Sequence, residues 1–243
     1  MAEDAWLRTL PVAVTRQPLR AHVDEVRFLV FGRALPAVLF ALLGYRVLLN
    51  LVAQVQAAVA HITPLGVIGV VPTALYFLFC TIPVGVYLGR PRAAARDGRF
   101  VARAAGLTGT TMLLVVGALG GPVLFTSPLP VQLISTALAI VAFSLAVYGL
   151  LSLRRNLSLI PEARRLVMTG PYRFIRHPLY AAEILAAVAM TVSRPALWAV
   201  VSLVPFVAVQ LLRARFEEGL LRRVFPEYVS YARHTRRLVP ALW

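Results

Sequence analysis

The segment LRRNLSLIPEARRLVMTGPYRFIRHPLYAAE, residues 153–183, is a polar stretch between two long apolar stretches, and it divides the chain into the parts from which the fold is predicted. Charged and aromatic polar side chains crowd into it, and Pro161, Pro171 and Pro178 interrupt it. Such a density of hydrogen-bond donors at the end of apolar helices indicates a site for a polar ligand.

The composition indicates that the apolar stretches cross a membrane. Of 243 residues, 59% are hydrophobic and 14% are charged, well below the ~25% charged residues of soluble domains. The net charge is +15, but the arginines cluster between apolar runs, as the positive-inside rule predicts, so we expect no nucleic-acid partner. The single cysteine, Cys80, lies in an apolar run and no zinc motif is present, so no metal site is expected.

The chain divides into three parts. Residues 1–27 are expected to form a cytoplasmic tail, residues 28–153 four transmembrane helices, and residues 154–243 a region with a helical hairpin and a cytoplasmic C-terminal helix. Because about 20 apolar residues cross a bilayer, we predict an all-α, polytopic membrane bundle of about six transmembrane helices. The arginine-rich connections place both termini in the cytoplasm, at what we expect to be a bacterial inner membrane.

Three boundaries follow from the same pattern. The first span is predicted from Phe28 to about Asn50. The uncharged run 104–153 is predicted to form a tight antiparallel hairpin of the third and fourth spans. The arginine-rich tail from Arg213 to Trp243 is predicted to lie on the membrane face as a helix.

One group of candidate site residues lies at the start of the last apolar hairpin. Gly170 and Pro171 predict a turn, with Pro171 at the first helical position. Tyr172, Arg176 and Tyr180 are then four residues apart on one helical face. Free backbone N–H groups at this helix start would suit a carboxylate. Alternatively, these side chains anchor a helix at the membrane interface, where Tyr and Arg are enriched.

A second group follows the last apolar run. Arg213 and Glu217 are four residues apart on one helical face, and Glu218 is adjacent. The simplest interpretation is a helix salt bridge worth a few tenths of a kcal/mol. A pair of adjacent glutamates just below a membrane span can also bind hydroxyls or a cation, and it lies at the expected depth of His177.

Taken together, the two groups resemble a family of membrane methyltransferases. The ordered pieces are Leu166–Tyr172 (LVMTGPY), Arg176–Tyr180 (RHPLY), Arg213 with Glu217-Glu218, and Phe225–Tyr231 (FPEYVSY). They resemble isoprenylcysteine carboxyl methyltransferase and the phospholipid methyltransferases over about the last 90 residues. The sequence departs from the family pattern at Arg164, where His is common, and at Ala182, where Gly is common.

The resemblance implies S-adenosylmethionine as the methyl donor, bound at the cytoplasmic side of the bundle. The residues that it assigns to the cofactor are Arg164, Arg165, Leu166, Val167, Tyr172, Arg176, His177, Pro178, Leu179 and Glu217. It implies that Arg213 faces the substrate, and we assign Tyr180 to the substrate as well. Arg213, His177 and Glu218 are the candidate catalytic residues.

The acceptor is expected to be lipophilic and to enter from the bilayer. A carboxylate, as in an isoprenylcysteine, needs no general base and would be positioned by Arg213. The alternative, a phospholipid head-group amine, has to lose a proton, for which Glu218 or His177 is the nearest candidate. A non-catalytic transporter or lipid-binding protein is the alternative of another class, and a membrane sterol reductase ranks last.

Overall fold

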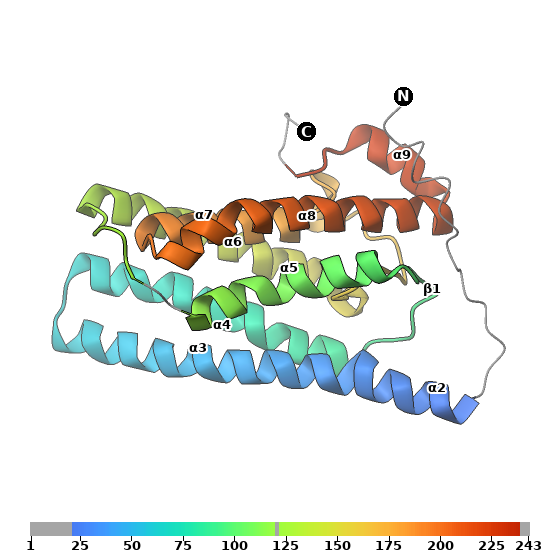
Figure 1. Cartoon of the computed structure of the whole chain (residues 1–243), viewed down its shortest axis with the longest axis horizontal. Helices are drawn as coiled ribbons and strands as arrows, with labels where there is room; N and C mark the ends of the chain where they lie inside the picture. The colour runs from blue at the N-terminus through green and yellow to red at the C-terminus, as the bar shows by residue number, and fades with distance from the viewer. Residues whose placement is uncertain (1–20, 120–121, 239–243) are drawn as a thin grey trace.

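The computed structural model describes residues 21–119 and 122–238. Most of the predicted N-terminal tail, residues 1–20, and the end of the predicted C-terminal tail, residues 239–243, lie outside the described residues. The helices of the bundle are α2 (Ala21–Arg27), the π-helix η1 (Phe28–Ala34), α3 (Leu35–Ala60), α4 (Pro64–Leu88), α5 (Phe100–Leu119), α6 (Leu129–Leu153), α7 (Pro178–Ser193) and α8 (Leu197–Val224) (Figure 1).

The predicted all-α membrane bundle is confirmed. Within the described residues, four helical stretches are long and apolar enough to cross a membrane, namely Asp24–Ala60, Pro64–Leu88, Leu129–Asn156 and Leu197–Val224. The shorter α7 is apolar as well. The first helical path continues ten residues past the predicted end at Asn50, to Ala60, because residues 51–60 (LVAQVQAAVA) contain no glycine or proline that would end it.

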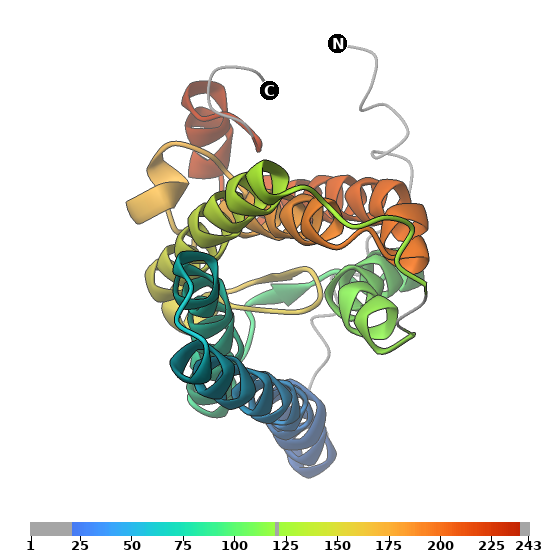
Figure 2. The ribbon, with the colours of Figure 1, turned by 90° about the vertical axis from the view of Figure 1, so that its left-hand side faces the viewer.

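The helices pack in an order that differs from their order in the chain. The contacting neighbours are α3 with α4, α4 with α6, α6 with α7, α7 with α8, and α8 with α5. Seen along the bundle, they form an arc that has α3 and α5 at its two ends (Figure 2). The predicted tight hairpin of the third and fourth spans is therefore wrong, since α5 packs against α8 rather than α6.

The two ends of the bundle are closed by pairings between connections. At one end, β1 (Ala95–Arg96) pairs antiparallel with β2 (Glu162–Ala163), which brings the chain after α6 into the middle of the arc (Figure 2). At the other end, the amide of Leu124 donates to the carbonyl of Pro195 at 2.9 Å, beside a bridge between Val123 and Ala196.

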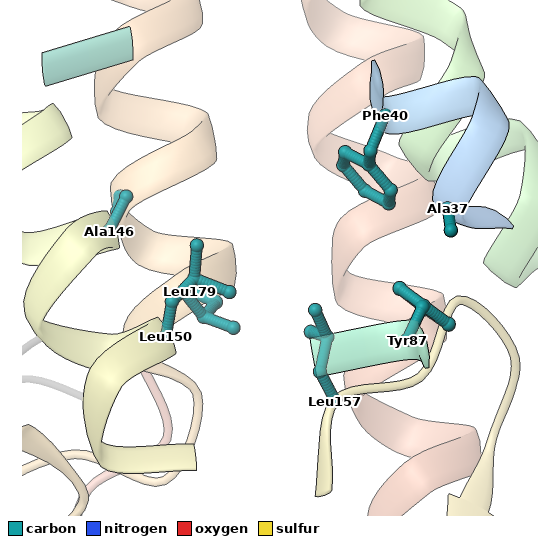
Figure 3. Packing of buried hydrophobic residues seen from close by; sticks show 8 residues of the cluster. Ala37, Phe40, Tyr87, Ala146, Leu150, Leu157 and Leu179 are labelled. Atoms are coloured by element: carbon teal, nitrogen blue, oxygen red, sulfur yellow. The ribbon is translucent and has the colours of Figure 1, made fainter. Parts of the chain in front are cut away.

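The main hydrophobic cluster joins α3, α4, α6 and α7 (Figure 3). Phe40 of α3 stacks on Tyr87 of α4 with ring centroids 5.8 Å apart. Leu150 of α6 and Leu179 of α7 belong to the same cluster and are less than one-tenth exposed. Burying an apolar side chain of this size stabilises the fold by about 1.5–3 kcal/mol, so this cluster fixes α7 against its neighbours.

The C-terminal part is arranged differently from the prediction. Helix α8 does not end at the membrane boundary near Arg213 but continues to Val224, because the residues beyond Arg213 have high helix propensity and contain no proline. Pro226 then separates it from a short helix, α9 (Glu227–His234). Figure 1 shows α9 and β1 at the same end of the bundle.

Gly170 is a position where the backbone requires glycine. Its φ of +62° lies in the left-handed region, and a Cβ atom there would approach the Ser152 hydroxyl oxygen to 2.3 Å. We expect Gly170→Ala to lower the free energy of unfolding by about 1–2 kcal/mol, measured as a lower Tm in detergent. Gly85→Ala is the matched control, because nothing lies within 4 Å of a Cβ there; an equal Tm loss in both variants would contradict the prediction.

Candidate active site

A cavity of about 450 Å³ lies inside the arc of helices. Residues from all six long helices line it, together with the connection 156–162 that enters the middle of the arc. Its walls are mostly apolar, with Leu39, Phe79 and Phe143 as examples. Its polar lining residues include Glu162, Tyr172, Arg176, His177, Tyr180, Glu183, Arg213 and Glu217. This volume and mixed lining are typical of a ligand pocket.

The RHPLY segment enters the cavity as a bent chain rather than as one helix. A 3₁₀ turn, η3 (Gly170–Arg173), ends before Phe174, and α7 begins only at Pro178. Tyr172 and Arg176 therefore do not share a helical face, which corrects the prediction, because Pro178 disfavours helix in the residue before it. Both side chains nevertheless line the same cavity.

The backbone N–H groups before α7 are occupied by the C-terminal segment. The amide of Arg176 donates to the carbonyl of Arg236 at 2.7 Å, and the amide of His177 donates to the carbonyl of Arg237 at 3.0 Å. These two donors, which precede α7, are therefore not free for a ligand carboxylate.

His177 lies between the two adjacent glutamates of α8. Its Nε2 is 3.2 Å from Oε1 of Glu218, and its Nδ1 is 3.7 Å from Oε2 of Glu217. The imidazole ring also stacks on the ring of Tyr180, with centroids 5.3 Å apart and planes 7° apart. These contacts fix the ring with one edge toward Glu217 and the cavity.

The two glutamates have different surroundings. Glu217 lines the cavity, its side chain is 34% exposed, and it accepts a hydrogen bond of 2.8 Å from the Tyr180 hydroxyl. Glu218 is 2% exposed and is absent from the described lining of the cavity. Three guanidinium groups lie within 3.5 Å of its carboxylate, those of Arg176, Arg222 and Arg237. Glu217 is thus placed to contact a ligand, whereas Glu218 is placed to hold neighbouring side chains.

Arg213 is buried at the cavity wall in a network that sequence reasoning missed. Its Nη1 donates to Oε1 of Gln210 at 2.7 Å and lies 3.4 Å from Oε2 of Glu183. Its Nη2 donates to the Thr110 hydroxyl at 3.2 Å, and its guanidinium lies over the Tyr180 ring at 4.6 Å. Gln210 and Glu183 are one turn from Arg213 and Tyr180, respectively, and this spacing is the signal that could have found them.

The predicted cofactor residues are divided by the structure. Tyr172, Arg176, His177, Leu179 and Glu217 line the cavity, as do the predicted substrate residues Tyr180 and Arg213. The remaining candidates are not part of its described lining, namely Arg164, Arg165, Leu166, Val167 and Pro178. Their assignment to the cofactor stays a prediction.

Part of the chain is similar to known proteins. Residues 129–228 match the phospholipid methyltransferase family. The predicted resemblance is confirmed, and the members of this family are integral membrane methyltransferases. The chain is also similar to the nickel-cobalt-cadmium resistance protein NccN of Alcaligenes xylosoxydans xylosoxydans, with 34% identity over 82 residues. That match spans 33% of this chain and 38% of the relative.

The phospholipid methyltransferase match contains every site residue that the sequence predicted. It does not contain Thr110, which holds Arg213, nor Arg237, which holds Glu218. In the part of the chain that the structure describes, no group of three His, Cys, Asp or Glu side chains is arranged to hold a metal ion.

At the cavity wall, Glu162 is the centre of a charge cluster that joins residues inside and outside the phospholipid methyltransferase match. Arg96 lies 2.8 Å and Arg90 3.6 Å from its carboxylate, Arg164 donates to it, and Ser158 donates to it at 2.7 Å. Burial by itself would raise the pKa of the Glu162 carboxyl, but these four neighbours outweigh it and hold the pKa below its usual range. The carboxylate therefore stays charged in the folded protein.

This shift predicts how stability depends on pH. A carboxyl whose folded pKa is depressed contributes stability above its unfolded pKa and loses it as the pH falls through the folded pKa. We expect Glu162→Gln to lower the free energy of unfolding by about 2 kcal/mol at neutral pH, and the difference from wild type to shrink below about pH 4. Thermal unfolding in detergent from pH 3 to 7 measures this, with the exposed Glu227→Gln as control; a difference that does not change with pH would contradict it.

Proposed function

We propose that this chain is a membrane-embedded S-adenosylmethionine-dependent methyltransferase that methylates the polar head of a lipophilic acceptor. The observation that carries the proposal is the cavity itself, whose lining joins Glu217, His177 and Arg213 to long apolar walls. A water-soluble donor suits the polar residues and a lipid chain suits the walls. We assign the arginine-rich end of the bundle to the cytoplasmic side of a bacterial inner membrane, following the positive-inside rule.

The residues present fit the proposed donor. Glu217 offers a partly exposed carboxylate to a cationic or hydroxylated ligand, and Tyr172, Arg176 and His177 line the same cavity. When bound, S-adenosylmethionine would supply an electrophilic methyl group on a sulfonium. The protein's part is to align the acceptor with that methyl group and to exclude water, and alignment alone can contribute ~7–11 kcal/mol.

The first candidate acceptor is a carboxylate of an isoprenylcysteine-like molecule. Its oxygen would form the new bond to the methyl carbon while the carbon–sulfur bond breaks and its electrons remain on sulfur. No proton moves in this reaction. Arg213 would orient the carboxylate by a charge-assisted hydrogen bond, as the family resemblance implies.

The second candidate acceptor is an amine, such as a phospholipid head group, and Glu183 favours it. One carboxylate oxygen of Glu183, Oε2, faces Gln210 and Arg213, whereas Oε1 takes no hydrogen bond from the described residues, although the side chain lines the cavity. An ammonium could donate to Oε1, pass its proton to this carboxylate, and then attack the methyl carbon as a neutral amine. Arg213 lies beside Glu183 and balances part of the negative charge of the Glu183 carboxylate.

Methyl transfer to two probe acceptors tests both candidates. Detergent-purified protein receives S-adenosylmethionine with a labelled methyl group and either N-acetyl-S-farnesylcysteine or vesicles of phosphatidylethanolamine. Label in a base-labile ester supports the carboxylate, and label in a base-stable head group supports the amine. A folded protein that neither binds S-adenosylhomocysteine nor labels either probe would overturn the enzymatic proposal and favour a transport or lipid-binding role.

A further inference from the structure

The C-terminal segment after α9 runs alongside the RHPLY segment as a short parallel pair. A bridge joins Ile175 and Arg236, and the two backbone hydrogen bonds from residues 176 and 177 described above extend it. Leu238, which follows, is 6% exposed. The segment is therefore packed into the fold and does not simply lie on a membrane surface.

Helix α9 adds side-chain contacts to the same region. The Tyr231 hydroxyl donates to the carbonyl of Tyr172 at 2.5 Å, and Nη1 of Arg176 donates to the carbonyl of Ala232 at 3.0 Å. Tyr228, on the same helix, is 1% exposed. Both Tyr172 and Arg176 line the cavity, so the C-terminal segment supports the cavity wall from outside.

Arg237 connects the C-terminal segment to the glutamate pair of α8. Its Nε donates to Oε1 of Glu218 and its Nη2 donates to Oε2, each at 3.1 Å. Such a two-point contact fixes the orientation of a carboxylate as well as its position. The same Oε1 lies 3.2 Å from Nε2 of His177, so the orientation of Glu218 sets which edge of the imidazole faces the cavity.

We propose that Arg237 is a positioning residue of the site, which fixes His177 through Glu218. The inference rests on the proposed function, because it takes His177 to be part of the donor site. Glu218, with its two oxygens held by Arg237, accepts the Nε2–H of His177, and this leaves Nδ1 as the ring nitrogen directed toward Glu217. Arg237 itself is absent from the described lining of the cavity.

The test compares neighbouring arginines in the full-length, detergent-purified protein. Arg236 is the matched control, since its side chain is exposed and its bond to the Arg176 amide uses only the backbone. We expect Arg237→Ala to weaken S-adenosylhomocysteine binding about 10- to 100-fold by calorimetric titration, and Arg236→Ala to change it less than twofold. Arg237→Lys keeps the charge but not the two-point contact, so we expect it to restore part of the affinity.

A second measurement reports on His177 without any ligand. The chain has four histidines, so ¹⁵N-histidine labelling with His177→Gln for assignment identifies the two ring nitrogens of His177. We expect wild type and Arg236→Ala to show the proton on Nε2, and Arg237→Ala to show a mixture of tautomers. This readout would not move if Arg237 only held the tail in place.

The outcomes separate the two levels of the proposal. If wild type binds S-adenosylhomocysteine, equal binding and an unchanged His177 tautomer in Arg237→Ala overturn the role of Arg237 alone. If wild type does not bind, the proposed function fails, and the tautomer still decides whether Arg237 positions His177. If Arg237→Ala does not fold, Arg237→Gln takes its place, because it keeps a polar side chain but removes the charge and the two-point contact, and an unchanged tautomer and affinity there overturn the inference.

Discussion

Replacing Glu217 by alanine is expected to weaken S-adenosylhomocysteine binding about 100-fold. Glu217 is the carboxylate of the adjacent pair that faces the cavity, and it also accepts the hydrogen bond of the Tyr180 hydroxyl. Its loss removes a charged hydrogen-bond partner from the ligand and leaves the Tyr180 hydroxyl without one. The Tyr180 hydroxyl loses its partner in both the free and the bound protein, so only the lost ligand contact changes the affinity. A hydrogen bond to a charged group contributes about 1.5–3 kcal/mol, and about 2.7 kcal/mol corresponds to 100-fold in affinity.

Calorimetric titration in detergent measures this effect, with Glu227→Ala as the control. Glu227 is an exposed glutamate at the start of α9, so the same substitution there should leave the affinity within twofold of wild type. Unchanged binding by a folded Glu217→Ala protein would remove Glu217 from the donor site.

Gly109→Ala is expected to slow methyl transfer about 100-fold while S-adenosylhomocysteine binding stays within twofold of wild type. A Cβ at this position of α5 would lie 2.5 Å from Cδ of Arg213 and 3.1 Å from Oε1 of Gln210. Arg213 would have to move away, and a misplacement of about 1 Å in a catalytic arrangement can cost 10²-fold. The effect is expected on the acceptor side because the three atoms nearest to this methyl group belong to Arg213 and Gln210 rather than to the donor candidates Glu217 and His177.

The measurement is the rate of label transfer to whichever probe the wild type methylates, beside a binding titration of the same preparation. Gly69→Ala serves as the control, because nothing lies within 4 Å of a Cβ at that glycine of α4. Equal transfer rates for Gly109→Ala and wild type would show that Arg213 does not need its present position.

Apolar length and arginine clusters predicted the fold class, because a bilayer imposes both on any chain that crosses it. The order of packing could not be predicted in the same way. A helix that is apolar on all sides has no apolar stripe that indicates which helix it packs against. The prediction therefore paired α5 with α6, its neighbour in the chain, whereas α5 packs against α8.

The candidate site was predictable where one helix turn relates its members. Spacing of three or four residues connects Arg213 to Glu217 and Tyr180 to Glu183, and all four line one cavity. Contacts between segments far apart in the sequence were not predictable. The amides of residues 176 and 177 donate to the backbone carbonyls of residues 236 and 237. Every residue carries a backbone carbonyl, so no side-chain pattern in the sequence predicts these hydrogen bonds.

The position of α5 in the arc has a consequence for how the protein is made. Roughly 80 residues separate the end of α5 from the start of α8, its main packing partner. Protein synthesis adds ~5–20 residues per second, so α5 spends about 4–16 s without its main packing partner before α8 is synthesised. Until then Gly109 and Thr110 lack their contact with Arg213, so the wall of the cavity that Arg213 forms is completed only after translation has passed residue 213.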